Sequence, residues 1–231
     1  MGNLLTSTKF KKTVNYVDLD AISKLESFGL SYDDIRTAFI KANEEKRKKP
    51  KYAMPLEVNL TMLIESVKIL RSLLLARGWA YEDKRNFNKT ISPNGRFTLT
   101  ISSGDEFVGN ITVPCKTKNK KGVICEKIVE MNNIIQLNLD IPNFQTYKLK
   151  YNPKLALNWF LMFHHTKNSI KLELSLPALY DLKTKKVISW YERIILPEIR
   201  LQDIIVNIND VDAPLKPLCD NILEDINITK K

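Results

Sequence analysis

The amino-acid sequence predicts an α+β fold, in which an N-terminal helical subdomain of about three helices packs on a five-to-seven-stranded, mainly antiparallel sheet. Over the first third of the chain, apolar residues recur every three or four positions, the period of an amphipathic helix. After residue 90 the period changes to two, which is typical of strands with one buried face. The 231 residues, 44% of them hydrophobic, are enough to bury a substantial core.

Two helices are expected between residues 20 and 50. Asp20 is placed to cap the first helix, and Gly29 is a natural stop for it. Ser31 and Asp34 have the spacing of a capping box, so the second helix is expected to begin there. Pro50 ends this helix after a run of charged residues, because proline cannot continue a helix.

The third expected helix, about Leu56 to Arg77, has the most regular pattern in the chain. Its apolar positions are spaced like the seam of a coiled coil: Leu56, Leu60, Leu63, Val67, Leu70 and Leu74. Further apolar residues widen this stripe, which favours packing inside the protein's own core. A homodimer formed through the same seam is the alternative.

Strands are expected wherever apolar and polar residues alternate. The segments with this pattern are 97–101, 111–113, 135–141, 147–151, 170–176 and 187–196. Each segment has a polar opposite face, so we expect an antiparallel sheet with one face open to water or to a partner. Residues 153–163 fit either a helix or a buried strand, and the sequence does not decide between them.

These patterns divide the chain into four segments. They are a basic N-terminal segment (1–16), the helical subdomain (17–85), the antiparallel β-sheet domain (90–200) and an acidic C-terminal tail (201–231). Charge is distributed unevenly: residues 1–197 carry a net charge of +13, although the whole chain carries +10. A body this basic attracts polyanions such as nucleic acids.

Two lysine-rich clusters are the candidate nucleic-acid-binding residues. They are Lys46, Arg47, Lys48, Lys49 and Lys51 in the first cluster, and Lys116, Lys118, Lys120 and Lys121 in the second. The second is expected at the exposed tip of a hairpin around residues 119–122. Aromatic residues that could stack on unpaired bases from an open sheet face are Tyr52, Tyr147, Tyr151, Trp190 and Tyr191. Arginine, the usual reader of bases, is scarce in these clusters, so we expect phosphate contacts that are independent of base sequence.

No motif in the sequence indicates a catalytic site clearly. Asp105 and Glu106 follow an expected strand, where carboxylates could hold a metal ion against a phosphodiester, but a simple turn is the favoured interpretation of these residues. His164 and His165 are adjacent, so their side chains diverge and cannot easily bind one metal ion. We therefore expect a non-catalytic protein with no metal and no cofactor, and we keep a metal-dependent phosphodiesterase at Asp105 and Glu106 as an alternative.

The cysteines and the N-terminus give indications of the cellular compartment in which the protein is found. Three widely spaced cysteines indicate a reducing, cytoplasmic compartment rather than a disulfide framework. No apolar run is long enough to span a membrane. Gly2 fits the short pattern for N-myristoylation, which Lys9, Lys11 and Lys12 would support at a membrane surface, although chance is the favoured explanation of so short a match.

The leading functional hypothesis is therefore a non-catalytic intracellular protein that binds nucleic acid through its lysine-rich loops. The main alternative is a protein-interaction module, either an assembly subunit or an inhibitor. Such a module would bind an acidic protein partner or associate with itself through the helix at residues 56–74.

Overall fold

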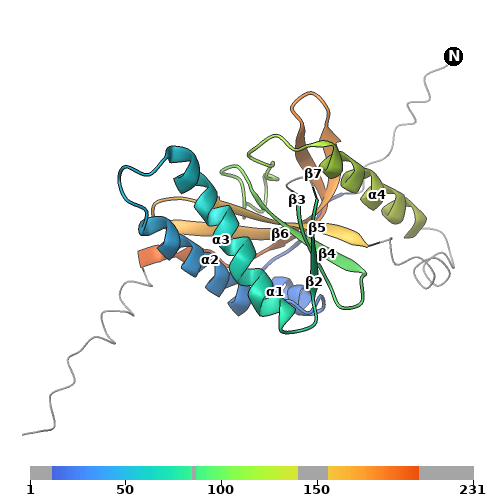
Figure 1. The fold of residues 1–231 in the computed structure, drawn as a ribbon. Coiled ribbons are helices and arrows are strands. Elements are labelled where there is room, and N and C mark those ends of the chain that lie inside the picture. The colour runs from blue at the N-terminus through green and yellow to red at the C-terminus, as the bar shows by residue number, and fades with distance from the viewer. Residues whose placement is uncertain (1–11, 85–86, 140–155, 203–231) are drawn as a thin grey trace, which may run out of the picture.

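The computed structural model describes residues 12–84, 87–139 and 156–202, which form an eight-stranded sheet with helices on both faces (Figure 1). The α+β class expected from the sequence is confirmed. The N-terminal residues with Gly2 lie outside the described residues, as do the acidic tail beyond residue 202 and the strand expected at 147–151.

The sheet has the strand order β1-β7-β6-β5-β4-β3-β2, with β8 paired to β6. The strands are β1 (Val14–Tyr16), β2 (Ala80–Lys84), β3 (Phe87–Ile91), β4 (Phe97–Ser103), β5 (Leu157–His165), β6 (Ser169–Asp181), β7 (Lys186–Ile195) and β8 (Ile199–Arg200). Most neighbouring strands are antiparallel, but β1 runs parallel to β7 and β4 runs parallel to β5. The segment that was ambiguous from sequence is thus β5, a buried strand inside the sheet.

The three N-terminal helices are α1 (Asp18–Glu26), α2 (Tyr32–Arg47) and α3 (Pro55–Leu75). Ser31 caps α2, and its hydroxyl accepts a hydrogen bond from the Asp33 backbone N–H. Gly29 follows α1 with a positive φ of 73°, as expected for a glycine that ends a helix. The cap expected at Asp20 is wrong, because α1 begins two residues earlier and Asp20 lies inside its first turn. None of the helices in the described ranges is both long and apolar enough to cross a membrane.

Helices α1, α2 and α3 cover one face of the sheet (Figure 1). Alternate residues of the central strands point into this main core, including Leu99 of β4, Trp159 of β5 and Leu172 of β6. Leu70 and Leu74 of α3 are fully buried in the same core. The C-terminal half of the coiled-coil-like pattern is therefore used for packing within the chain.

The other face of the sheet is not open, and that expectation is wrong. The loop of residues 104–122 and helix α4 (Val123–Leu139) cover it (Figure 1). Polar β4 side chains on this face are buried, and Thr98 donates a hydrogen bond to Asn158 of β5 over 2.6 Å. A second apolar core lies beside them: Val108, Cys115, Cys125, Val129, Phe160, Met162, Val187 and Trp190.

Helix α4 replaces the strand expected at residues 135–141. Its buried residues Cys125, Val129, Asn132 and Ile135 recur at helical spacing, but a polar residue interrupts the apolar stripe. Asn132 can be buried because its side-chain amide donates a hydrogen bond to the Asn158 carbonyl oxygen and accepts one from the Asn158 N–H. These backbone groups of Asn158 are available because Asn158 precedes the part of β5 that pairs with β6. The strand expected at 111–113 is also wrong, since this segment is exposed loop.

Candidate nucleic-acid interface

The two lysine-rich clusters meet at one edge of the sheet, where the parallel strands β4 and β5 end at Ser103 and His165. The last turns of α2 bring Lys46 to this edge. The loop after β4 brings Lys118, whose backbone N–H donates to the Ser103 carbonyl oxygen over 2.9 Å. Burial lowers the pKa of Lys46, and the nearby positive charge of Lys118 lowers it further. Two clusters that are distant in sequence are therefore close in space.

Lys46 is held in place by a histidine. Its Nζ lies 3.2 Å from Nδ1 of His165, whose Nε2 lies 2.9 Å from the Asn43 side-chain oxygen. Because that oxygen can only accept, the arrangement assigns the ring proton to Nε2 and leaves Nδ1 to accept from Lys46. Burial lowers the pKa of His165 to about 4, and the charges of Lys46 and His164 act in the same direction. His165 is therefore neutral at neutral pH and serves as the acceptor that orients Lys46.

The loop that carries Lys116 and Lys118 is tightly bonded to itself. The Asp105 carboxylate accepts hydrogen bonds from the backbone N–H groups of Phe107 and Lys116. Gly104 forms a β-bridge with Thr117 across the base of the loop. A Cβ at Gly104 would lie 2.3 Å from the Val108 side chain, so only glycine fits there without rearrangement.

A buried ion pair fixes this loop to the sheet. Arg193 of β7 donates to the Glu173 carboxylate of β6 through Nη2 at 2.6 Å and Nε at 3.1 Å, and both side chains are fully buried. The same carboxylate accepts from the Gly109 backbone N–H and the Cys115 thiol of the loop. Burial raises the pKa of Cys115, and Glu173 raises it further, so the thiol stays protonated and donates. Sequence reasoning missed this pair, because nothing in a strand pattern marks two charges as partners.

The hairpin tip expected at residues 119–122 is wrong. This segment lies along the sheet: the Thr117 N–H donates to the Val187 carbonyl oxygen, and the Lys121 N–H donates to the Lys185 carbonyl oxygen. The Lys121 ammonium points inward and donates to the Ser102 hydroxyl over 2.6 Å, and burial lowers its pKa. Of the second cluster, the exposed residues are Lys116, Lys118 and Lys120.

In the first cluster, ion pairs hold two of the lysines. Lys48 bonds Glu45 and Lys49 bonds Glu57, each at 2.6 Å. Arg47 and Lys51 are exposed, and neither makes an ion pair within the part of the chain that the structure describes.

Of the aromatic candidates, Tyr52 is the best placed to stack on a base. It follows Lys51 directly and is 91% exposed. Trp190 is only 1% exposed and donates its indole N–H to the Cys115 carbonyl oxygen, so it cannot stack on a base. Tyr191 is half-buried, and its hydroxyl is hydrogen-bonded to the side chain of Asn133. Tyr147 and Tyr151 lie outside the described residues.

The acidic pair considered for metal binding lies at the same edge. Both oxygens of Asp105 accept hydrogen bonds from loop N–H groups, while Glu106 is exposed. His164 lies beside the loop, with Nδ1 3.4 Å from the Gly104 carbonyl oxygen. Across residues 12–84, 87–139 and 156–202, no three His, Cys, Asp or Glu side chains are grouped to hold a metal ion.

Comparison of the chain with protein-family models, with curated proteins and with solved structures finds no match.

Proposed function

We propose that this protein binds nucleic acid without reading its base sequence, through a surface that we call the basic edge. The basic edge consists of Arg47, Lys48, Lys51, Lys116, Lys118 and Lys120, which are all exposed. The observation that carries the proposal is the meeting of the two clusters where β4 and β5 end. Lysines that are distributed evenly keep a protein soluble, whereas lysines gathered from two segments form a local positive potential.

Single-stranded nucleic acid is the preferred ligand in this proposal. Lysines contact phosphates as point charges, which favours backbone binding at any sequence. Tyr52 beside Lys51 adds an exposed ring on which an unpaired base can stack. In a duplex the bases are already stacked on one another, so this ring contributes only to binding of single strands.

The test is fluorescence anisotropy with random-sequence single- and double-stranded oligonucleotides over a salt series. On single strands each neutralised phosphate contributes about 0.7 to the slope of log affinity against log salt. Replacing three lysines of the basic edge (K116Q/K118Q/K120Q) should therefore reduce the slope by about 2 and weaken binding at low salt roughly tenfold or more.

The matched control removes the same charge elsewhere. Lys84, Lys89 and Lys127 line a separate cavity, and none of the residues that line it belongs to the basic edge. The K84Q/K89Q/K127Q variant should retain most of the affinity. Equal weakening by both triple variants would contradict a localised site. A lack of binding at low salt would overturn the proposal, and the basic edge would then fit an acidic protein partner.

A second candidate function is self-association through α3. The N-terminal half of this helix leaves apolar side chains in solvent, with Leu56 62% exposed and Ile64 55% exposed. Only this half of the coiled-coil-like pattern is free to pair, because Leu70 and Leu74 are buried in the core. Light scattering tests it: a dimer that the I64K variant converts to a monomer would support this function, and a monomeric wild type would exclude it.

A further inference from the structure

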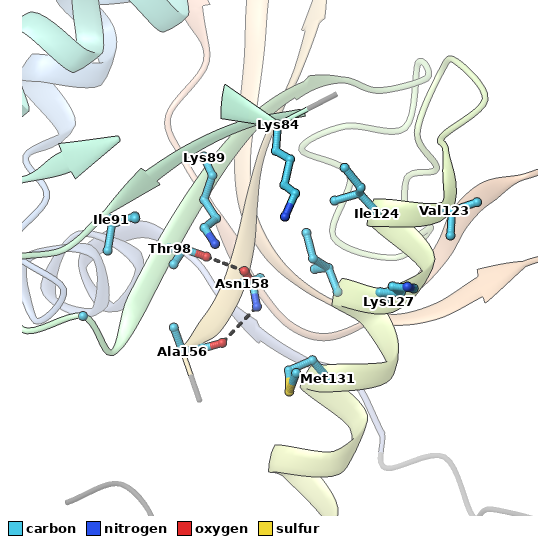
Figure 2. Close-up of a pocket in the computed structure, with 12 residues that line it drawn as sticks. Lys84, Lys89, Ile91, Thr98, Val123, Ile124, Lys127, Met131, Ala156 and Asn158 are labelled. Atoms are coloured by element: carbon cyan, nitrogen blue, oxygen red, sulfur yellow. Dashed lines mark hydrogen bonds between the residues drawn. The ribbon is translucent and has the colours of Figure 1, made fainter. Parts of the chain in front are cut away.

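A cavity of about 660 Å³ lies between α4 and strands β2 to β5, and none of its lining residues belongs to the basic edge (Figure 2). This volume falls in the range of small-molecule binding sites. Its lining comes from three parts of the fold: Lys84, Lys89, Ile91, Gly95 and Thr98 from β2 to β4, Val123, Ile124, Lys127, Ile128 and Met131 from α4, and Ala156 and Asn158 from β5.

One wall of the cavity is apolar. Ile124, Ile128 and Met131 line it along α4, and Ile91 of β3 contributes from the strands. Met131 remains 37% exposed although it lies between the helix and the sheet. Apolar side chains that face a hollow rather than one another leave room for an apolar ligand.

Side chains on the floor of the cavity are hydrogen-bonded to one another and to the backbone. Thr98 donates to the Asn158 side-chain oxygen, and the Asn158 amide donates to the Ala156 carbonyl oxygen, as the dashed lines in Figure 2 show. Asn132 bonds the backbone of Asn158 from the other side. These hydrogen bonds make the floor rigid, so the strongest partners for a polar ligand group are the charged residues.

All the charged residues that line the cavity are positive. Lys84 and Lys89 extend into it from the strands, and Lys127 lies opposite them on α4 (Figure 2). The Lys89 ammonium lies 3.1 Å from the Glu82 carboxylate. Lys84 and Lys127 make no ion pair within the described part of the chain, and no acidic residue lines the cavity. Three ammonium groups around one hollow repel one another, and an anion between them relieves that repulsion.

We propose that this cavity binds an amphipathic organic anion. The apolar body of the ligand lies along Ile124, Ile128 and Met131, and its carboxylate, sulfonate or phosphate head lies between the three lysines. The combination carries the proposal, because an apolar wall alone would accept neutral ligands and a lysine cluster alone would accept inorganic ions. The site is distinct from the basic edge, because none of the residues that line the cavity belongs to that surface.

The test compares two fluorescent probes with the full-length protein. 1-Anilinonaphthalene-8-sulfonate carries an apolar ring system and an anionic head, and N-phenyl-1-naphthylamine has the same rings without the sulfonate. We expect the anionic probe to bind more tightly. The K89Q/K127Q variant should weaken it about tenfold, which corresponds to about 1.4 kcal/mol, and should leave the affinity of the neutral probe unchanged.

Two controls separate this cavity from other surfaces. The M131W variant should weaken binding of both probes, because the larger indole side chain occupies the apolar part of the cavity. Met131 is partly exposed, so the replacement does not disturb the buried core. The I64K and K116Q/K118Q/K120Q variants should change neither probe, and circular dichroism shows whether each variant is folded. Equal affinity for the two probes, an unchanged anionic probe in K89Q/K127Q, or weakening by I64K alone would overturn the proposal.

Discussion

Replacing Arg193 with methionine tests the role of the buried ion pair most directly. Methionine keeps an unbranched side chain of similar reach but removes the positive charge. Glu173, which is fully buried, would lose its two guanidinium hydrogen bonds and keep the neutral donors of Cys115, Ser175 and Gly109. Breaking a buried pair from one side costs about 3–5 kcal/mol, because a buried charge is left uncompensated.

This loss is large compared with the total stability of a domain, about 5–15 kcal/mol. Urea unfolding followed by circular dichroism at neutral pH should show a much lower midpoint with little change in slope. The matched variant is E173Q/R193M, in which the carboxylate charge is removed as well. It should be more stable than R193M alone, since glutamine still accepts a hydrogen bond and leaves no buried charge.

Two results would refute this reasoning. One is a loss below about 1 kcal/mol in R193M, which is the size expected for a pair in contact with water. The other is an E173Q/R193M variant that is no more stable than the single variant. Because the pair also holds Gly109 and Cys115, R193M should loosen the loop that carries Lys116 and Lys118.

The remaining predictions concern His165 at the end of β5 and Gly104 at the start of the loop. His165 has a pKa lowered from 6.5 to about 4 in the folded protein, so the unfolded chain binds more protons between these values. Its contribution to stability is therefore complete above pH 6.5 and is lost as the pH falls toward 4. Discounted for partial exposure, it amounts to about 1–2 kcal/mol, and comparing wild type with H165Q in urea at pH 4.5 and 7 should show it. G104A should destabilise the protein by about 1–3 kcal/mol, because the new methyl group overlaps the loop packing. G122A meets nothing within 4 Å and is the control, so similar thermal shifts in both variants would contradict the prediction.

The elements that could be predicted from sequence are those whose pattern is local. β4 and β6 place alternate residues in the main core, and Ser31 and Gly29 mark helix ends through their own backbone preferences. Each of these signals lies within a few residues of the feature that it predicts. The α+β class follows from them without any knowledge of tertiary contacts.

The elements that were missed depend on partners distant in sequence. Helix α4 has Asn132 in its buried stripe, and this residue is explained only by its bonds to Asn158, 26 residues away. The polar face of β4 is buried for the same reason, since Thr98 finds its acceptor 60 residues later. A polar residue on a strand therefore indicates a solvent-exposed face only when no residue distant in sequence can form a hydrogen bond with it.

The sequence identified the residues of the candidate site but not how they are arranged in space. The lysines of both clusters are evident in the sequence, but their meeting at the end of β4 and β5 follows from the sheet topology. Lys121 has the same charge as Lys120, yet its ammonium is turned inward to Ser102. The buried ion pair of Glu173 and Arg193 cannot be recognised in the sequence, because each residue alone looks like an ordinary charged residue on a strand.

Both proposed sites have one structural origin, the parallel pairing of β4 and β5. Antiparallel neighbours can be joined by a tight turn, whereas parallel neighbours need a connection that crosses back over the sheet. Here that connection includes the loop of residues 104–122 and helix α4, which together cover the second face. The loop places lysines at the carboxyl ends of the two strands, and α4 forms one wall of the cavity. The segment between β4 and β5 therefore completes the core and contributes different residues to the two candidate sites, so charge removal at one site should leave binding at the other site unchanged.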